Sequence, residues 1–197
     1  MADHTKHSFT AVVMANGCPI NTLESISIGP VILDSPGSTP AYGIDGRRTL
    51  GMFNCTDGDW AHGEELGLIT FQQGSAPTPW VFYFRHFEEG YRIYLRSGEH
   101  FGEGVFIGQD RQVEVRPITS RDPALWSLVD AQTGDKIDIT QHQPDDLEVH
   151  LISDEGYPLE IHAMYPVGAF LACHATAGRG TLSLTIQRRE ENWLNPA

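Results

Sequence analysis

The amino-acid sequence predicts an all-β fold, and three observations support that prediction. Short runs of β-branched and aromatic residues recur along all 197 residues, and most are bounded by Gly, Pro, Asp or Ser. The 20 glycines and 12 prolines provide many possible turns. Hardly any stretch repeats its apolar residues with the period of an α-helix. Together these features are typical of short antiparallel strands joined by turns.

The expected strands begin in the N-terminal part of the chain with four apolar runs. These runs cover residues 8–14, 25–33, 49–54 and 66–72. Between the second and the third, residues 34–48 are rich in Pro, Gly and Ser, which predicts a loop.

The middle of the chain gives the clearest strand pattern. The aromatic run WVFYFRHF is followed by a Glu88-Glu89-Gly90 turn, and several of the later runs alternate apolar and polar residues as half-buried strands do. A second loop, rich in Pro and charge, is expected at 141–146. The strands expected from here on are 80–87, 91–96, 104–107, 112–117, 125–130, 136–140, 147–152, 159–164, 170–174 and 182–187.

Three tryptophans, Trp80, Trp126 and Trp193, occupy similar settings after a polar or Pro-containing turn and an earlier strand. Each could open the last strand of a repeated four-strand unit. In this respect the chain resembles the β-trefoil superfamily, including its ricin-B-like lectin type. The resemblance implies three units, at about 26–87, 91–130 and 147–197, within one domain that spans 1–197. It also implies a tryptophan in the core near the end of each unit.

The chain departs from the lectin type in two ways. The glutamine that this type carries two residues before the tryptophan is replaced by Thr78, Ala124 and Glu191, so the sugar-binding signature is absent. The spacing between the second and third tryptophans is also longer than that between the first two, which requires an insertion in the last unit. A jelly roll or another β-sandwich is therefore kept as an alternative fold.

Charge and cysteine content narrow the possible partners and locations. The formal net charge of −13 disfavours nucleic acid and anionic membrane surfaces as partners. Cys18, Cys55 and Cys173 are odd in number and widely spaced, which favours reduced core thiols over disulfides or a zinc site. The N-terminus has no apolar leader segment, and no later stretch approaches the roughly 18 apolar residues of a membrane span. A cytoplasmic location is expected.

One acidic segment, NCTDGDWAHGEE at 54–65, is the candidate ligand-binding site. Asp57, Asp59, Trp60 and His62 combine an aromatic face with hydrogen-bonding groups, which suits the C–H faces and hydroxyls of a sugar. The alternative interpretation is an ordinary acidic turn in which Trp60 caps the core. The order of the carboxylates does not match an EF-hand calcium loop.

A second set of residues raises the alternative of a zinc site. His150, His162 and His174 lie on or beside expected strands and could converge if those strands were neighbours. Histidines that serve only the structure remain the alternative. No GxSxG elbow, phosphate-binding loop or dinucleotide fingerprint is present, so neither a catalytic nucleophile nor a nucleotide cofactor is expected.

Three functional hypotheses follow. The leading one is a non-catalytic, lectin-like module that binds carbohydrate, without a metal or other cofactor. The second is a protein–protein interaction module, such as a protease inhibitor, a toxin component or an immunity-type protein, whose loops contact a partner. The third is a metal-dependent enzyme built on the three histidines.

Overall fold

The computed structural model describes residues 4–29, 31–34, 43–66, 69, 71–75, 77–119, 121–164, 167–174 and 178–192. Within these ranges the protein is built of strands, one α-helix and two 3-10 helices, so the all-β prediction is confirmed. No helix of this part of the chain is long and apolar enough to cross a membrane.

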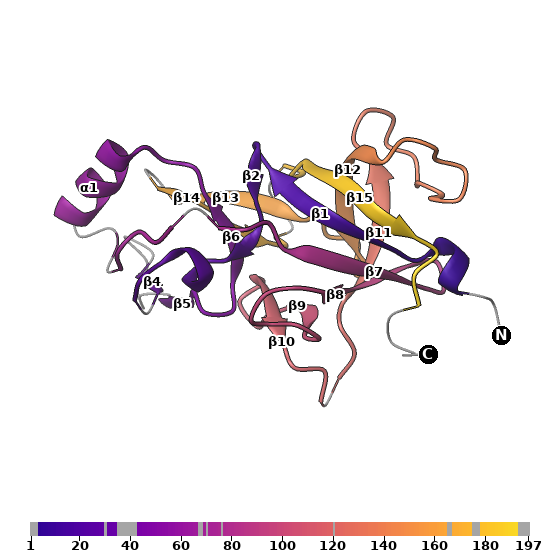
Figure 1. Ribbon diagram of the computed structural model, residues 1–197, viewed down its shortest axis with the longest axis horizontal. Coiled ribbons are helices and arrows are strands. Elements are labelled where there is room, and N and C mark those ends of the chain that lie inside the picture. The colour runs from indigo at the N-terminus through magenta and orange to yellow at the C-terminus, as the bar shows by residue number, and fades with distance from the viewer. Residues whose placement is uncertain are drawn as a thin grey trace.

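Six strands form a closed antiparallel barrel (Figure 1). Each of the six pairs with the next along the chain, and the last pairs with the first. Closure removes the edges that an open sheet would expose, and it differs from the two facing sheets of a sandwich. The barrel strands are β1 (Phe9–Ala15), β7 (Val81–Phe87), β8 (Gly90–Leu95), β11 (Leu125–Asp130), β12 (Asp146–Ser153) and β15 (Leu182–Arg189).

The other strands are inserted at three places between barrel strands. β6 pairs with β14, and two single bridges, from Thr49 to Glu114 and from Gln112 to Ala172, also link the insertions to one another. Between β1 and β7 lie β2 (Cys18–Pro19), β3 (Asn21–Thr22), β4 (Ile32–Asp34), β5 (Gly43–Asp45) and β6 (Leu50–Phe53). Between β8 and β11 lie β9 (Gly104–Ile107) and β10 (Val113–Arg116), and between β12 and β15 lie β13 (Glu160–Met164) and β14 (Gly168–Ala172).

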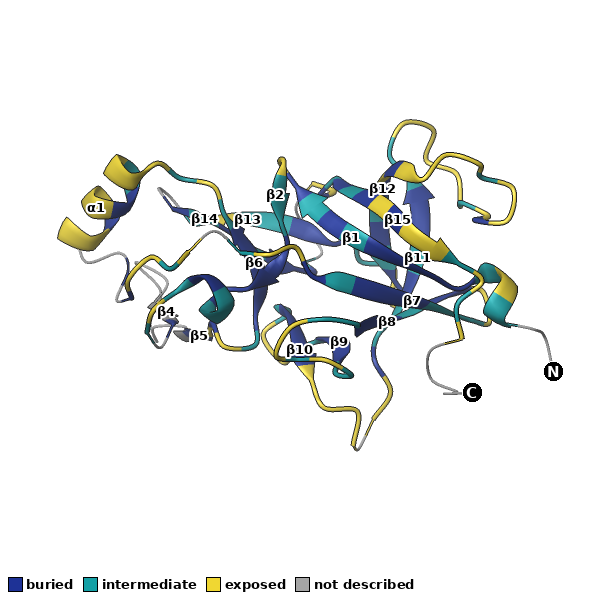
Figure 2. Ribbon diagram, viewed as in Figure 1, coloured by how far each residue is buried: buried dark blue, intermediate teal, exposed yellow. Residues whose placement is uncertain are grey.

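The centre of the barrel is packed in the same way by each third of the chain. Besides Phe84, each third supplies four side chains around the barrel axis, two from its barrel strands and two from its insertion. These side chains are buried, as Figure 2 shows for the strands that carry them. From β1 to β7 they are Val13, Ile20, Leu50 and Phe82; from β8 to β11, Ile93, Val105, Val113 and Trp126; from β12 to β15, Leu151, Leu159, Leu171 and Leu182.

Two features of this packing bear on the repeat, which stays a prediction. The first barrel strand begins at Phe9, so the fold uses residues well before 26. Trp80 directly precedes β7. The first third of the chain contributes Phe82 to the barrel centre, as the second third contributes Trp126. The last third contributes Leu182, and the predicted equivalent tryptophan, Trp193, lies outside the described residues.

Most expected strands are present, but two do not occur among the described residues, and a third, 25–33, is a strand only from Ile32, where β4 begins. Residues 25–33 begin with the 3-10 helix η2 (Glu24–Ile26), where Ser25 and Ser27 bond to backbone carbonyls and hold a turn. At 136–140 the Asp138 carboxylate accepts bonds from the Thr140 amide and hydroxyl, which favours a turn over extended chain. The described residues within 66–72 belong to no strand.

The two expected loops have different outcomes. The loop expected at 141–146 is confirmed up to Asp145. Within the loop expected at 34–48, residues 35–42 lie outside the described part of the chain, and Gly43–Asp45 form β5.

Candidate functional site

The acidic segment expected to bind ligand forms a helix, α1 (Asp57–Glu65), instead of a turn. Thr56 and Asp59 explain why, because they form a capping box: the Thr56 hydroxyl accepts from the Asp59 amide, and the Asp59 carboxylate accepts from the Thr56 amide. Bonds from Thr56 also lower the pKa of Asp59. Asp59 therefore serves the helix terminus, while Asp57 and His62 lie exposed on the helix surface.

Trp60, the aromatic platform of the predicted site, is buried. Only 4 % of its surface is exposed, and its ring packs edge-on against Phe53 and Phe71 at centroid distances of 4.9 and 5.4 Å. These rings belong to a second hydrophobic cluster that joins α1 to β6, at the end of the molecule away from η1 (His4–His7) (Figure 1). Trp60 cannot offer a stacking face to a sugar, so the alternative of a core-capping tryptophan describes it correctly.

The structure brings the three candidate metal-binding histidines only partly together. The rings of His162 and His174 lie 4.9 Å apart, while His150 bonds through Nδ1 to the Gly180 carbonyl at 3.1 Å. His162 is engaged by a carboxylate, Glu160, at 2.8 Å. No group of three or more potential metal ligands occurs among the described residues. The geometry thus provides no metal centre in this part of the chain.

A pocket lies along β13, in the insertion between β12 and β15. Its volume is about 610 Å³, within the range of small-molecule sites. A β1–β2 turn with positive φ at both Asn16 and Gly17, as Asn-Gly hairpins favour, brings Asn16 to one wall. Segment 178–181 supplies another wall. Its lining includes the polar residues Asn16, Asn54, Glu160, His162 and Arg179 and the apolar residues Met52, Ile161 and Ala169.

Glu160 is the unusual residue of this pocket. Its side chain is only 3 % exposed, and its Oε2 bonds to His162 Nε2 at 2.8 Å. Its other oxygen, Oε1, is buried and has no hydrogen-bond partner among the residues that the structure describes. A buried acceptor without a partner costs roughly 1–3 kcal/mol, and more when charged. Such a cost is often tolerated where a bound molecule supplies the missing donor.

His162 adds a ring surface to the same strand face. It stacks on Phe170, its cross-strand neighbour on β14, with the ring centroids 5.3 Å apart and the planes 21° from parallel. About 31 % of the His162 side chain remains exposed. The pocket therefore has a fixed imidazole held between a carboxylate and an aromatic ring.

Cys173 lies close to Glu160 and is almost fully buried. Burial, with a smaller effect from the Glu160 carboxylate, raises the pKa of this thiol to about 12. The nucleophilic form of cysteine is the thiolate. We expect iodoacetamide at pH 8 to leave Cys173 unmodified in the folded protein while half-buried Cys18 is alkylated, as read by peptide mass spectrometry. Alkylation of Cys173 at the rate of Cys18 would contradict this assignment.

The pocket contains acceptors, donors and apolar surface in close proximity. Glu160 provides an acceptor oxygen without a partner among the described residues, Asn16 and Asn54 provide both donors and acceptors, and Arg179 is an exposed cation. Among the described lining residues Glu160 is the single carboxylate, whereas glycoside hydrolysis normally needs two. This arrangement is suited to reversible binding of a molecule rich in hydroxyl groups.

Comparisons with protein-family models, with curated proteins and with solved structures found no match to this chain. The site therefore rests on its own geometry. Sequence reasoning singled out His162 but missed Glu160, which stands two residues earlier and so on the same strand face. A Glu-x-His pair in a strand with apolar neighbours was the signal available.

Proposed function

We propose that this chain is a non-catalytic, carbohydrate-binding module with a β-trefoil architecture, and that the pocket along β13 holds the sugar. The observation that carries the proposal is the buried Oε1 of Glu160, which has no hydrogen-bond partner among the described residues and belongs to a pocket large enough for a small saccharide.

The trefoil architecture is supported by the order of the strands. Each third of the chain runs from a barrel strand through an insertion to a second barrel strand, and each third supplies four side chains to the barrel centre. The three insertions also contact one another, by β6–β14 pairing and by the bridges to Glu114 and Ala172. These features suit a threefold arrangement of units with little sequence similarity.

The ligand class is inferred from the chemistry of the lining. Sugars combine hydroxyl groups, which can donate to a carboxylate and exchange bonds with amides, with apolar C–H faces. Glu160 and Asn54 supply the first kind of contact, and Ile161 and Ala169 supply the second. A hydroxyl donor is well matched to Oε1, because an O–H···O⁻ bond is among the stronger hydrogen bonds.

The test is a glycan array on the tag-free protein, followed by calorimetry of any hit with Glu160→Gln. The amide is close to the carboxylate in shape but lacks its charge, so we expect about tenfold weaker binding or more. The matched control is Glu148→Gln on β12, because Glu148 is exposed and bonds to Ser183. A blank array, or equal affinity for Glu160→Gln and the parent, would refute the proposal.

A further inference from the structure

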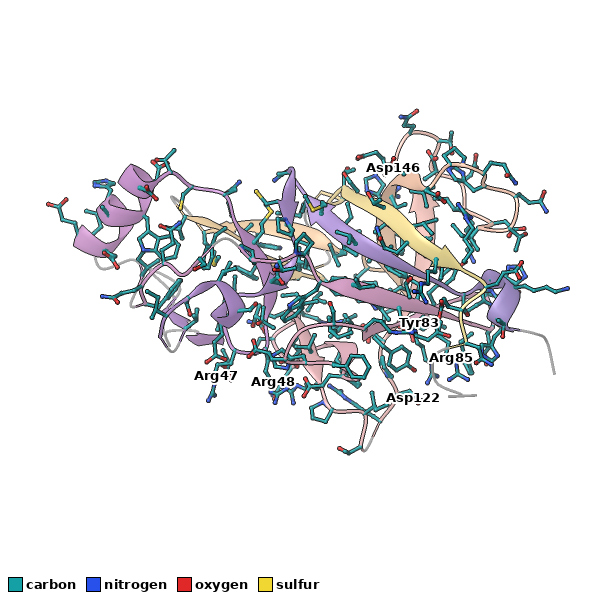
Figure 3. The ribbon with its side chains drawn as sticks, in the orientation of Figure 1. Arg47, Arg48, Tyr83, Arg85, Asp122 and Asp146 are labelled. Atoms are coloured by element: carbon teal, nitrogen blue, oxygen red, sulfur yellow. The ribbon has the colours of Figure 1, made fainter. Side chains whose placement is uncertain are left out.

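The outer face of the β7–β8 hairpin gathers positive charge in a protein whose net charge is −13. Inward-facing residues of this hairpin, such as Phe84 and Ile93, belong to the core. The alternate residues therefore face outward, and the register places Tyr83 opposite Tyr94 and Arg85 opposite Arg92. Figure 3 shows Tyr83 and Arg85 close together on this side of the molecule, with Asp122 nearby.

The opposition of Arg85 and Arg92 is costly in the free protein. Side chains directly opposite on antiparallel strands lie roughly 5 Å apart at Cβ, and like charges at that separation destabilise the pair. The surrounding rings are buried, since Tyr83 is 0 % and Tyr94 3 % exposed. Burial weakens the screening that water would otherwise provide.

Both guanidinium groups also carry an unused donor. The Nε atoms of Arg85 and Arg92 are buried, and neither has a hydrogen-bond partner in the described part of the chain. Arg92 pairs through a terminal nitrogen with Asp122, and its guanidinium lies 4.2 Å from the centre of the Phe87 ring. Arg85 bonds to the Tyr94 hydroxyl, and within the described residues it has no carboxylate partner.

An oxyanion would relieve the repulsion between the two arginines. It would neutralise their like charges, and its oxygens could accept hydrogen bonds from the terminal N–H groups of the two guanidiniums. The planar arginine fork matches phosphate and sulfate geometry better than the point charge of lysine does. The surrounding acidity disfavours a long polyanion such as nucleic acid, because most of its length would lie against negative surface.

We propose that Arg85 and Arg92 together form a binding site for a compact oxyanion, a phosphate or sulfate group, and that Asp122 is the resident carboxylate that this group displaces. The Asp122 side chain is 73 % exposed, so it can leave Arg92 without disrupting the core. Arg92 itself is 17 % exposed, which opens the site to solvent on that side. This site is independent of the pocket along β13.

The experiment titrates the full chain with inorganic phosphate, sulfate and O-phosphoserine, each against chloride at constant ionic strength, by calorimetry. We expect saturable binding of phosphate or sulfate. Arg85→Lys removes the planar guanidinium and should weaken the binding of phosphate or sulfate about tenfold. Tighter binding of O-phosphoserine than of inorganic phosphate would identify a phosphate ester as the source, and equal binding would identify the free ion.

Two further variants separate binding from structural effects. Asp122→Asn removes the competing carboxylate, so it should tighten phosphate binding severalfold, an outcome that a purely structural role for the arginines does not produce. Arg47→Gln is the control, because Arg47 is exposed, pairs with Asp45 and lies well away from Arg85 (Figure 3). Absence of saturable binding, or unchanged affinity in both Arg85→Lys and Asp122→Asn, would overturn the proposal.

Discussion

Replacement of Trp126 by alanine should destabilise the protein by about 3–5 kcal/mol, the largest loss expected from a single substitution in the barrel. Trp126 is 0 % exposed, and its side chain is one of the set that fills the barrel centre from all three parts of the chain. Truncation would leave a cavity at the centre of the barrel. Because small domains are stable by only about 5–15 kcal/mol, much of the fold stability would be lost.

Urea denaturation followed by circular dichroism measures this effect without relying on tryptophan fluorescence. Trp126→Phe is the matched variant: it keeps an aromatic ring and also removes an indole Nε1 that is buried without a partner. The two effects offset one another, so we expect a loss below about 1.5 kcal/mol. Ile118→Ala, at a residue that is 44 % exposed, should change the free energy of unfolding by less than about 0.5 kcal/mol. Equal losses for Trp126→Ala and Ile118→Ala would contradict the packing described above.

The role of Trp126 also explains why the repeat was only partly readable from the sequence. Strand identity could be predicted because alternation and turn residues act locally, and the strands at 104–107 and 125–130 were confirmed with the same ends. Phe82, Trp126 and Leu182, one from each third of the chain, line the barrel centre. Three different residue types share this centre, because the packing depends on the total volume around the axis. Trp80 and Trp126 are both buried, but only Trp126 of the two lines the barrel centre, and Trp193 lies outside the described residues, so the repeat inferred from tryptophan spacing stays a prediction.

The candidate site was harder to predict for a related reason. Trp60 beside carboxylates has the composition of a sugar-binding turn, but the Thr56–Asp59 capping box folds the segment into a helix that turns the indole toward Phe53 and Phe71. The unpartnered oxygen of Glu160 depends on how β13, β14 and segment 178–181 meet, which no local pattern encodes. Local sequence patterns predicted most of the strands, whereas the candidate site arises from contacts between segments that are distant in the sequence.

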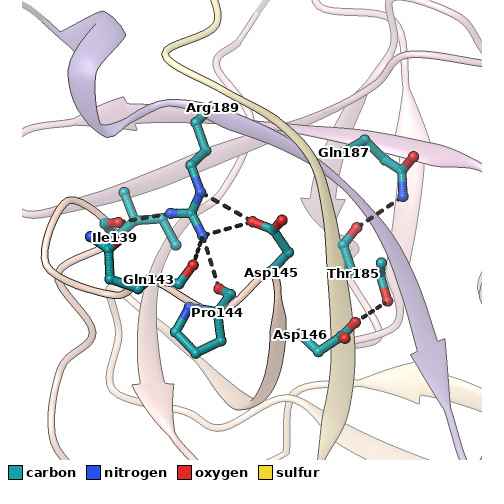
Figure 4. Close-up of polar contacts among 8 residues, drawn as sticks. All are labelled: Ile139, Gln143, Pro144, Asp145, Asp146, Thr185, Gln187 and Arg189. Atoms are coloured by element: carbon teal, nitrogen blue, oxygen red, sulfur yellow. Dashed lines mark hydrogen bonds and ion pairs between the residues drawn. The ribbon is translucent and has the colours of Figure 1, made fainter.

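Arg189 provides a second test of such long-range contacts, because it fixes the long connection that precedes β12. From the end of β15 its guanidinium donates to the carbonyls of Ile139 and Pro144, at 3.0 and 2.9 Å, and to the Asp145 carboxylate at 3.0 and 3.2 Å (Figure 4). A longer contact of 3.5 Å reaches the Gln143 carbonyl. One side chain thus satisfies backbone acceptors that belong to no strand.

Arg189→Ala should cost about 2–3 kcal/mol, a value reduced from the sum of the separate bonds because Arg189 is 31 % and Asp145 63 % exposed. Arg189→Lys should recover little of this loss, since an ammonium group cannot span acceptors that lie on both sides of a planar fork. Asp145→Asn retains an acceptor and should cost less than about 1 kcal/mol.

Hydrogen exchange distinguishes release of the connection from general destabilisation. In Arg189→Ala, the backbone amides of 139–146 should exchange faster under native conditions. The amides of β8, which lies across the barrel from β15, should keep their exchange rates. A uniform increase across both segments would mean that Arg189 supports the barrel as a whole. Selective exchange at 139–146 would instead assign it to the connection, where its bonds to Ile139 and Pro144 tie a segment without strand pairing to the end of β15.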